Sequence, residues 1–276
     1  GVIQYFPRGS SRSIKSSMNQ QKADKAHFMS KDALLKAAYD VSKNWLELYF
    51  WLRAEEIVKQ SRSWFSNLVG VTESRYRVGS ATQQDVVQSE LELDRLTDRL
   101  EGIRIKQDIA RSDLSRWIGA QASMRGLPNE LPLMLSPGIS DALPVLASHP
   151  VIQATDAEIR ASSDSVDLSR QSYKPGFAVD VTYGDRSGEN PDGSERANFL
   201  SAMVLMDVPL FTDKRQDRKL ASSQQNLEAV KQERETALRK MLSQLQRSQS
   251  SLRIIDRQVL LYRDKLIPQS HTHSEL

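Results

Sequence analysis

Apolar residues recur every seven positions through several long stretches of the chain, and this spacing limits what the chain can fold into. A seven-residue spacing places one apolar stripe along an α-helix and favours coiled-coil packing against a second helix. The clearest row is Leu238, Leu245, Leu252, Val259 and Leu266. Similar rows run through 82–118, and no proline interrupts 31–74. We therefore expect long helices that pack as rods.

The residues from Tyr76 to Thr82 predict a tight turn between two of these helices. Gly79 can adopt the left-handed conformation that ends a helix. Ser80 is followed three residues later by Gln83, which is typical of a capping box at the start of the next helix. We expect 31–119 to form an antiparallel helical hairpin.

After Lys174 the hydrophobic period changes from that of a helix to two, which predicts a strand over 177–184 with one apolar and one polar face. A loop rich in Gly, Asp, Asn and Ser follows, and a second strand is expected over 199–208. The apolar positions of the first strand are Phe177, Val179, Val181 and Tyr183. The fold class expected is therefore mainly α with a β-hairpin.

The remaining segments complete the expected organisation. Residues 1–30 are polar and lack a period, so we expect them to be disordered. Prolines and glycines predict a linker over 120–150. The region 151–268 is expected to hold a helix, the two strands and a long helix over 212–266, and 269–276 is expected to be a tail.

The composition argues against several classes of function. The chain has no cysteine, which excludes disulfides, thiolate metal sites and cysteine nucleophiles. Its 38 basic and 35 acidic residues are interspersed, so we expect no nucleic-acid partner. We find no catalytic constellation and expect neither an enzyme nor a cofactor. His271 and His273 lack a third ligand, so no metal site is expected.

An amphipathic hairpin between long rods has little protein to cover its apolar face. A transmembrane β-barrel requires such strands, and strands from elsewhere must close the ring. In this interpretation Phe177, Val179, Val181 and Tyr183 face lipid. The residues expected to face a water-filled lumen are Asp180, Thr182 and Ser201. The alternative is a soluble antiparallel coiled-coil scaffold, in which the polar positions are simply exposed.

Five stretches, in this order, resemble the TolC-like outer-membrane efflux proteins. The first looks like the helix-turn segment of that family, and the second like the end of its return helix. The third is similar to the opening of a second repeat, and the last two to the junctions that bracket a strand pair. They are Ser74–Val86, Leu114–Gly119, His149–Ile152, Lys174–Phe177 and Asp207–Phe211.

The resemblance implies a passive channel subunit in the outer membrane of a Gram-negative bacterium that extends into the periplasm. Such a subunit would form a homotrimer in outer-membrane lipid and serve tripartite efflux or type I secretion with an inner-membrane pump. A periplasmic adaptor protein would contact the turn at Arg75, Val78, Gly79, Ser80 and Thr82. Helix capping alone also accounts for Gly79 and Ser80. The chain looks like the back half of one repeat joined to the front half of the next, with two of the four strands of each subunit.

Overall fold

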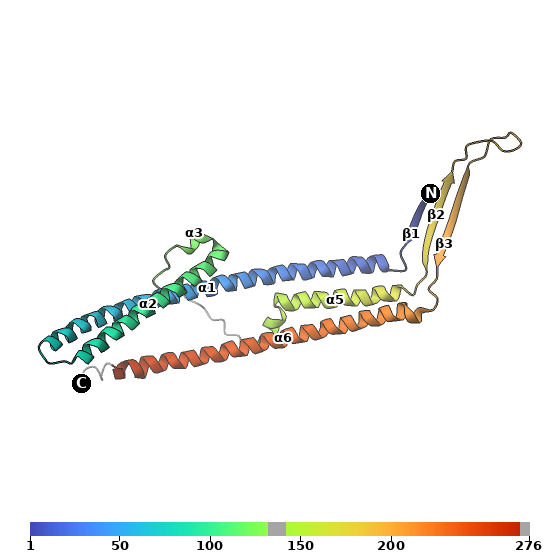
Figure 1. Ribbon diagram of the computed structural model, residues 1–276. Helices are drawn as coiled ribbons and strands as arrows, with labels where there is room; N and C mark the ends of the chain where they lie inside the picture. The colour runs from blue at the N-terminus through green and yellow to red at the C-terminus, as the bar shows by residue number, and fades with distance from the viewer. Residues whose placement is uncertain (132–141, 271–276) are drawn as a thin grey trace. The chain divides into compact units, whose positions relative to one another are not determined.

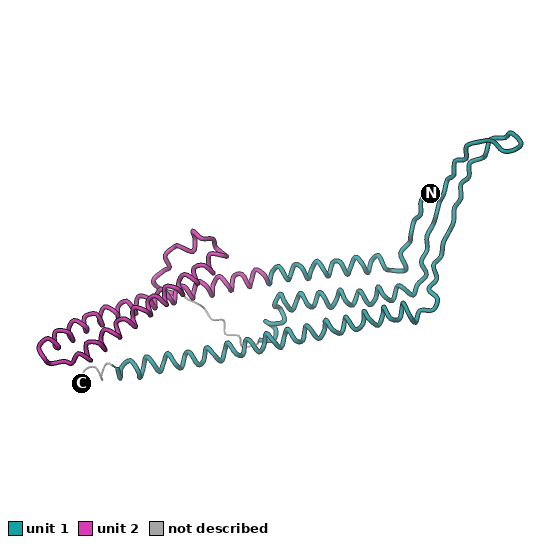
Figure 2. Tube along the Cα trace, viewed as in Figure 1, with its two compact units in different colours: residues 1–32, 138–276 teal, residues 33–137 magenta. Residues whose placement is uncertain are grey.

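A computed structural model describes residues 1–131 and 142–270 (Figure 1). The chain divides into two compact units (Figure 2). The sheet unit comprises Gly1–Asp32 and Gly138–Leu276, and the hairpin unit comprises Ala33–Pro137. The boundary at residue 32 falls inside helix α1, Ser11–Arg77, which therefore contributes to both units.

The hairpin unit consists of α1 from Ala33 onward, α2 (Gln83–Ile118) and the short α3 (Ala120–Ser123). The expected helix pair is present. Its apolar stripes meet in two buried clusters, one around Leu48 and one around Val58. Leu48 has no exposed surface and packs with Ala110 and Leu114. The seven-residue spacing thus marks the seam that holds this unit together.

Replacing Leu48 by alanine removes the most deeply buried side chain of that seam. We expect Leu48→Ala to lower the free energy of unfolding of the hairpin unit by about 3 kcal/mol, since a cavity remains. The readout is urea unfolding followed by tryptophan fluorescence. It is specific because all four tryptophans, Trp45, Trp51, Trp64 and Trp117, lie in this unit.

The matched control is Leu91→Ala on α2, where the leucine is 48% exposed. This change is expected to cost less than about 0.5 kcal/mol. Equal losses for the two variants would show that the α1–α2 seam does not stabilise the unit.

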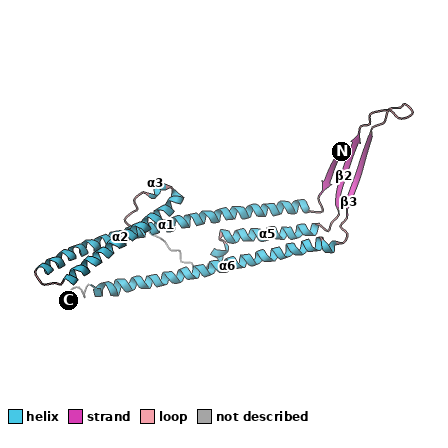
Figure 3. Cartoon of the chain, in the orientation of Figure 1, coloured by secondary structure: helices cyan, strands magenta, loops and turns pink. Residues whose placement is uncertain are grey.

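The sheet unit contains three antiparallel strands in the order β1–β2–β3 (Figure 3). They are β1 (Val2–Phe6), β2 (Gly176–Gly184) and β3 (Phe199–Asp207). The two expected strands are present within about a residue of their expected bounds. The expectation of a two-stranded contribution is wrong, because β1 pairs with the free edge of β2 from Val2↔Val181 to Phe6↔Phe177.

The sheet continues directly into helices of the same unit (Figure 1). After β1 the chain enters α1, α5 (Pro150–Gln171) precedes β2, and β3 leads through the 3₁₀ turn η1 (Thr212–Lys214) to α6 (Gln216–Leu261). A short helix, α4 (Ala142–Ala147), precedes α5. Ala154, Ala157 and Ala161 are buried on α5. Small side chains at these positions let neighbouring helices approach closely.

Polar contacts fix the register between α5 and α6. The hydroxyl oxygens of Ser169 and Ser223 lie 2.8 Å apart, and the Tyr173 hydroxyl donates to Asp217 Oδ1 at 2.6 Å. Each contact joins residues that are far apart in sequence. The two helices are therefore held by specific polar pairs as well as by the small apolar seam.

The expectation that residues 1–30 are disordered is wrong. The segment forms β1 and the first turns of α1. Gln21 accepts a hydrogen bond from Arg160 at 2.6 Å, and Lys25 forms an ion pair with Glu158 of α5 at 3.0 Å. Contacts with another helix can stabilise a helix whose own sequence has no strong apolar stripe. The hydrophobic period therefore does not predict this first part of α1.

The last helix also continues further than expected. A π-helical turn, η2 (Tyr262–Leu266), is followed by helical residues through Ser270, so the helix passes its expected end at residue 266 and includes Pro268. Proline lacks an N–H and clashes with the carbonyl four residues earlier, and a π turn relieves such a conflict. The tail residues 271–276, with His271 and His273, lie outside the described residues, as do 132–141 of the linker. The described linker contains α3 and α4.

Candidate membrane surface and helical turn

The register of the three strands gathers apolar side chains on one side of the sheet. Residues paired across antiparallel strands project from the same face. Phe177 lies between Phe6 and Met206, and Val181 lies between Val2 and Ala202. The full set, called here the apolar face, is Val2, Gln4, Phe6, Phe177, Val179, Val181, Tyr183, Leu200, Ala202, Val204 and Met206. Gln4 is its one polar amide.

Most of the apolar face is exposed. The exposed fraction is 74% for Val2, 71% for Val204 and 60% for Met206, and Phe177, Val181 and Tyr183 are also exposed. Val179 in the middle is half-buried. Contiguous exposed apolar patches mark protein or membrane contacts. The four residues expected to face lipid thus belong to a larger surface that spans all three strands.

The opposite face of the sheet is mixed. Thr182 pairs with Ser201, and the Thr182 hydroxyl donates to Asp180 Oδ1 at 3.1 Å. The three residues expected to face a lumen therefore share one face. Ala178 on the same face is buried between its partners Tyr5 and Leu205. This face thus carries polar and apolar side chains together, in contrast to the apolar face.

The turn at the end of α1 is closed by main-chain hydrogen bonds. Gly79 has a φ of +79°. Its N–H donates to the Tyr76 carbonyl at 2.9 Å, and the Ser80 N–H donates to the Arg75 carbonyl at 2.9 Å. This pair of bonds is the Schellman motif, with glycine at the left-handed position. The expected role of Gly79 in ending the helix is confirmed.

The capping box that starts α2 is formed by Thr82 and Asp85. The Thr82 side chain accepts from the Asp85 N–H at 3.2 Å, and Asp85 Oδ2 accepts from the Thr82 N–H at 2.7 Å. The expected pair, Ser80 and Gln83, is wrong, because the Ser80 hydroxyl donates to the Arg75 carbonyl and completes the preceding cap. The backbone and side-chain hydrogen bonds from Thr82 lower the pKa of Asp85.

Around this turn the side chains are available to a partner. Val78 is 77% exposed. Arg75 and Val78 border an open groove along α1 whose other lining residues include Asn67, Gly70 and Val71. A Cβ atom added at Gly70 or Gly79 would have no neighbouring atom within 4 Å, so both positions face open space. The turn therefore combines a rigid backbone with free side-chain surfaces.

The capping box predicts a pH-dependent helix start. Thr82→Ala should destabilise the first turn of α2 by about 1 kcal/mol, and Thr82→Ser should largely preserve it. Because the folded pKa of Asp85 lies below its ordinary value near 4, its contribution is complete above about pH 4. It is lost as the pH falls through the lowered value.

Amide hydrogen exchange of residues 83–86, measured on wild type, Asp85→Ala and Thr82→Ala, checks this expectation. The difference between wild type and Asp85→Ala should shrink in acid. A difference that persists below the pKa of Asp85, or none at neutral pH, would contradict the assignment of the cap.

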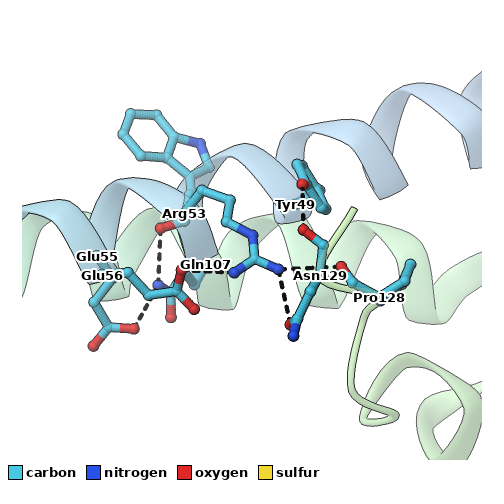
Figure 4. A network of polar contacts seen from close by, with 8 residues as sticks. Tyr49, Arg53, Glu55, Glu56, Gln107, Pro128 and Asn129 are labelled. Carbon is cyan, nitrogen blue, oxygen red and sulfur yellow. Dashed lines mark hydrogen bonds and ion pairs between the residues drawn. The ribbon is translucent and has the colours of Figure 1, made fainter. Parts of the chain in front are cut away.

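A polar network fastens the segment after α3 to α1 (Figure 4). Arg53 donates through Nη2 to the Pro128 carbonyl at 3.2 Å and to Asn129 Oδ1 at 3.1 Å. The Tyr49 hydroxyl donates to the Asn129 carbonyl at 3.0 Å. Nη1 of the same guanidinium donates to Glu56 Oε2 at 2.6 Å, so its fork of donors links this segment to a carboxylate of α1.

A second part of the network joins α1 to α2 (Figure 4). The Gln107 amide donates to the Trp51 carbonyl at 3.1 Å and to Glu55 Oε2 at 2.9 Å. Hydrogen bonds from Lys59 and Gln107 lower the pKa of Glu55. These contacts fix the register of the hairpin beside its apolar seam.

Other kinds of site are not apparent in the described ranges. Among residues 1–131 and 142–270, no group of three or more His, Asp or Glu side chains is placed to hold a metal ion. Nor does any described helix have the length and apolar character needed to cross a membrane. Within the described residues, the apolar face and the helical turn are the two candidate functional surfaces.

No protein-family model matches the sequence, and no curated protein matches it either. Solved structures do. A membrane protein from Pseudomonas aeruginosa is similar with a TM-score of 0.78 at 16% identity, over 98% of this chain and 66% of that one. The outer membrane protein VceC of Vibrio cholerae has a TM-score of 0.75 at 18% identity, over 99% and 65%. The CmeC outer membrane channel of Campylobacter jejuni has 0.77 at 12%, over 98% and 60%.

The chain has the fold of these three membrane proteins. The expected TolC-like architecture, long antiparallel helices with a small antiparallel sheet, is confirmed. The chain spans about 60 to 66% of the length of the three proteins, so it corresponds to a part of each.

Proposed function

We propose that the chain is part of an outer-membrane channel subunit that serves as a passive export duct in tripartite efflux or type I secretion. The observation that carries the proposal is the apolar face, which is exposed across all three strands of a sheet that continues into long helices. A face of this kind is favourable in contact with the hydrocarbon of a membrane. The fold shared with outer-membrane channels supports the same conclusion.

Closure of the barrel requires further strands. In the described residues β1 and β3 each have one unpaired edge. Unpaired N–H and C=O groups are very costly in hydrocarbon, so a spanning sheet must close on itself. In the proposal, copies of the subunit related by threefold symmetry supply the neighbouring strands. The unpaired edges of the sheet and the shared fold support the proposed homotrimer.

The two faces take different roles in this barrel. Phe177, Val179, Val181 and Tyr183 contact lipid, as do their partners on β1 and β3. Asp180, Thr182 and Ser201 line the aqueous lumen through which cargo passes. No catalytic step is involved, because an inner-membrane pump would supply the energy for transport.

The helical turn is the proposed contact with a periplasmic adaptor. Arg75, Val78, Gly79, Ser80 and Thr82 lie at the end of the α1–α2 pair. The Schellman turn and the capping box hold the backbone, which leaves the Arg75 and Val78 side chains to be recognised. In the proposal the helices extend through the periplasm and this end meets the adaptor.

Cysteine labelling tests the assignment of the two faces. The chain has no native cysteine, so single substitutions give unique reporters. In protein reconstituted into lipid vesicles, Asp180→Cys, Thr182→Cys and Ser201→Cys should react several-fold faster with a charged maleimide than Phe177→Cys, Val179→Cys and Val181→Cys. Lipid excludes the charged reagent, whereas a lumen admits it.

Val181→Cys and Thr182→Cys form a matched pair, because neighbouring residues of one strand project to opposite faces. Their rates should become similar after unfolding in urea. Equal rates in vesicles, or recovery of the chain entirely in the aqueous fraction, would contradict the channel and favour the soluble scaffold.

A further inference from the structure

The segment that leaves β3 projects bulky apolar side chains outward. Val208 is 47% exposed, Leu210 is 70% exposed and Phe211 is 91% exposed. They follow Met206 of the apolar face and precede η1. The exposed apolar surface therefore continues past the end of the sheet to the point where α6 begins.

Phe211 also has an unusual backbone conformation. Its φ is +54°, the only positive value for a non-glycine residue in the described ranges 1–131 and 142–270. A bulky L-residue at such an angle is strained, and glycine would adopt it at a lower cost. Few intramolecular contacts offset the strain, because the side chain is almost wholly exposed. A contact between the phenyl ring and a molecule outside the described chain would bury the ring and compensate for the backbone strain.

Four basic residues follow Phe211 closely in the chain. Lys214, Arg215, Arg218 and Lys219 follow it on η1 and α6, and all four are exposed. None of the four takes part in an ion pair with another described residue. Asp213 and Asp217 lie in the same stretch, so 213–219 holds four cations and two carboxylates and is net positive beside the exposed apolar side chains. Asp217 accepts a hydrogen bond from the Tyr173 hydroxyl.

The charge differs between the two ends of the sheet. The segments that join strands to helices, 7–16, 171–176 and 207–219, hold eight basic and three acidic residues. One of these acids, Asp207, is paired with Arg8. The loop 184–198 at the other end holds two basic and four acidic residues. The positive charge is therefore confined to the helix end of the apolar face.

We propose that Leu210, Phe211 and the four cations Lys214, Arg215, Arg218 and Lys219 form a docking surface for anionic phospholipid. The proposal rests on the proposed function, which places the apolar face in a membrane, and adds the lipid class and the leaflet. Leu210 and Phe211 insert at the level of the headgroups. The lysines and arginines contact lipid phosphates of the leaflet on the helix side.

The chemistry of the surface supports one occupant. Phe and Leu side chains that project beside basic residues insert at the boundary between lipid headgroups and acyl chains. Each Lys or Arg near an anionic surface adds attraction that is screened by salt. Because the surface is continuous with the apolar face, a lipid that covers one also reaches the other.

A vesicle-binding experiment tests the role of the charges. Full-length chain in detergent is diluted into vesicles of phosphatidylcholine alone or with phosphatidylglycerol, and bound protein is separated by flotation. Replacing the four cations by glutamine should weaken binding to the anionic vesicles by at least about tenfold. Binding to neutral vesicles should be unchanged, and the difference should disappear in high salt.

The matched control removes the same charge elsewhere on α6. Arg239, Lys240, Arg247 and Arg253 are exposed and can be replaced by glutamine together. This variant should bind anionic vesicles within about twofold of wild type, since charges far from the bilayer are screened. An equal loss in both variants would show a general effect of net charge and overturn the proposal.

A fluorescent probe tests the insertion of the apolar pair. Leu210→Cys labelled with bimane should shift to shorter emission wavelengths with anionic vesicles, whereas bimane at Ser80→Cys on the helical turn should not. Phe211→Gly relieves the backbone strain and removes the ring. It should therefore leave thermal unfolding unchanged or improved while weakening binding to anionic vesicles.

The outcomes separate this proposal from the proposed function. If the chain enters neutral and anionic vesicles equally, and the bimane at position 210 stays in water in both, the docking surface is refuted while the channel stands. In that case an acidic protein becomes the occupant to examine. If the chain enters neither kind of vesicle, the channel itself is refuted.

Discussion

The register of one small antiparallel sheet sets the chemistry of the whole sheet unit. A shift of a single residue would move every side chain of a strand to the other face. The observed pairing puts Phe6, Phe177 and Met206 in one row and Val2, Val181 and Ala202 in another. Neither row is buried by the described chain. Such a sheet requires a surface outside the described chain, either protein or membrane, to cover its apolar face.

The strands meet the helices through a few polar contacts that hold this register. Arg8, directly after β1, forms an ion pair with Asp207 at the end of β3. It also donates to the Ser172 carbonyl at 2.9 Å, beside the start of β2. One guanidinium therefore ties all three strand ends together where the helices begin. The exposed Phe211 and the four cations that follow it lie at this same helix end of the sheet. The residues that hold the strand ends together and the residues that give this end its surface charge are therefore neighbours.

Sequence patterns predicted the elements whose side chains repeat regularly. The helical repeat predicted the helix pair whose buried seam lies around Leu48. The alternation through Val181 predicted β2 and its apolar face, which is exposed in the described chain. β1 was missed because five residues, apolar on both faces, carry no clear period. The start of α1 was missed because ion pairs such as Lys25 with Glu158 stabilise it. Such contacts depend on residues far apart in sequence, as does the Arg53 network. The capping box lies at Thr82 and not at Ser80 because α2 begins only at Gln83, while the Ser80 hydroxyl donates back to the Arg75 carbonyl.

The hairpin unit separates the residues that stabilise it from those that it presents. Its stability rests on buried clusters around Leu48 and Val58 and on the Gln107 hydrogen bonds between the helices. Its turn is held by main-chain bonds, by the Ser80 hydroxyl and by the capping box of Thr82 and Asp85, with Gly79 at the left-handed position. Arg75 and Val78 contribute backbone or open surface there, so their side chains can vary without loss of the fold. In the proposed adaptor contact, the side chains that meet the partner can therefore change while the helices beneath them stay the same.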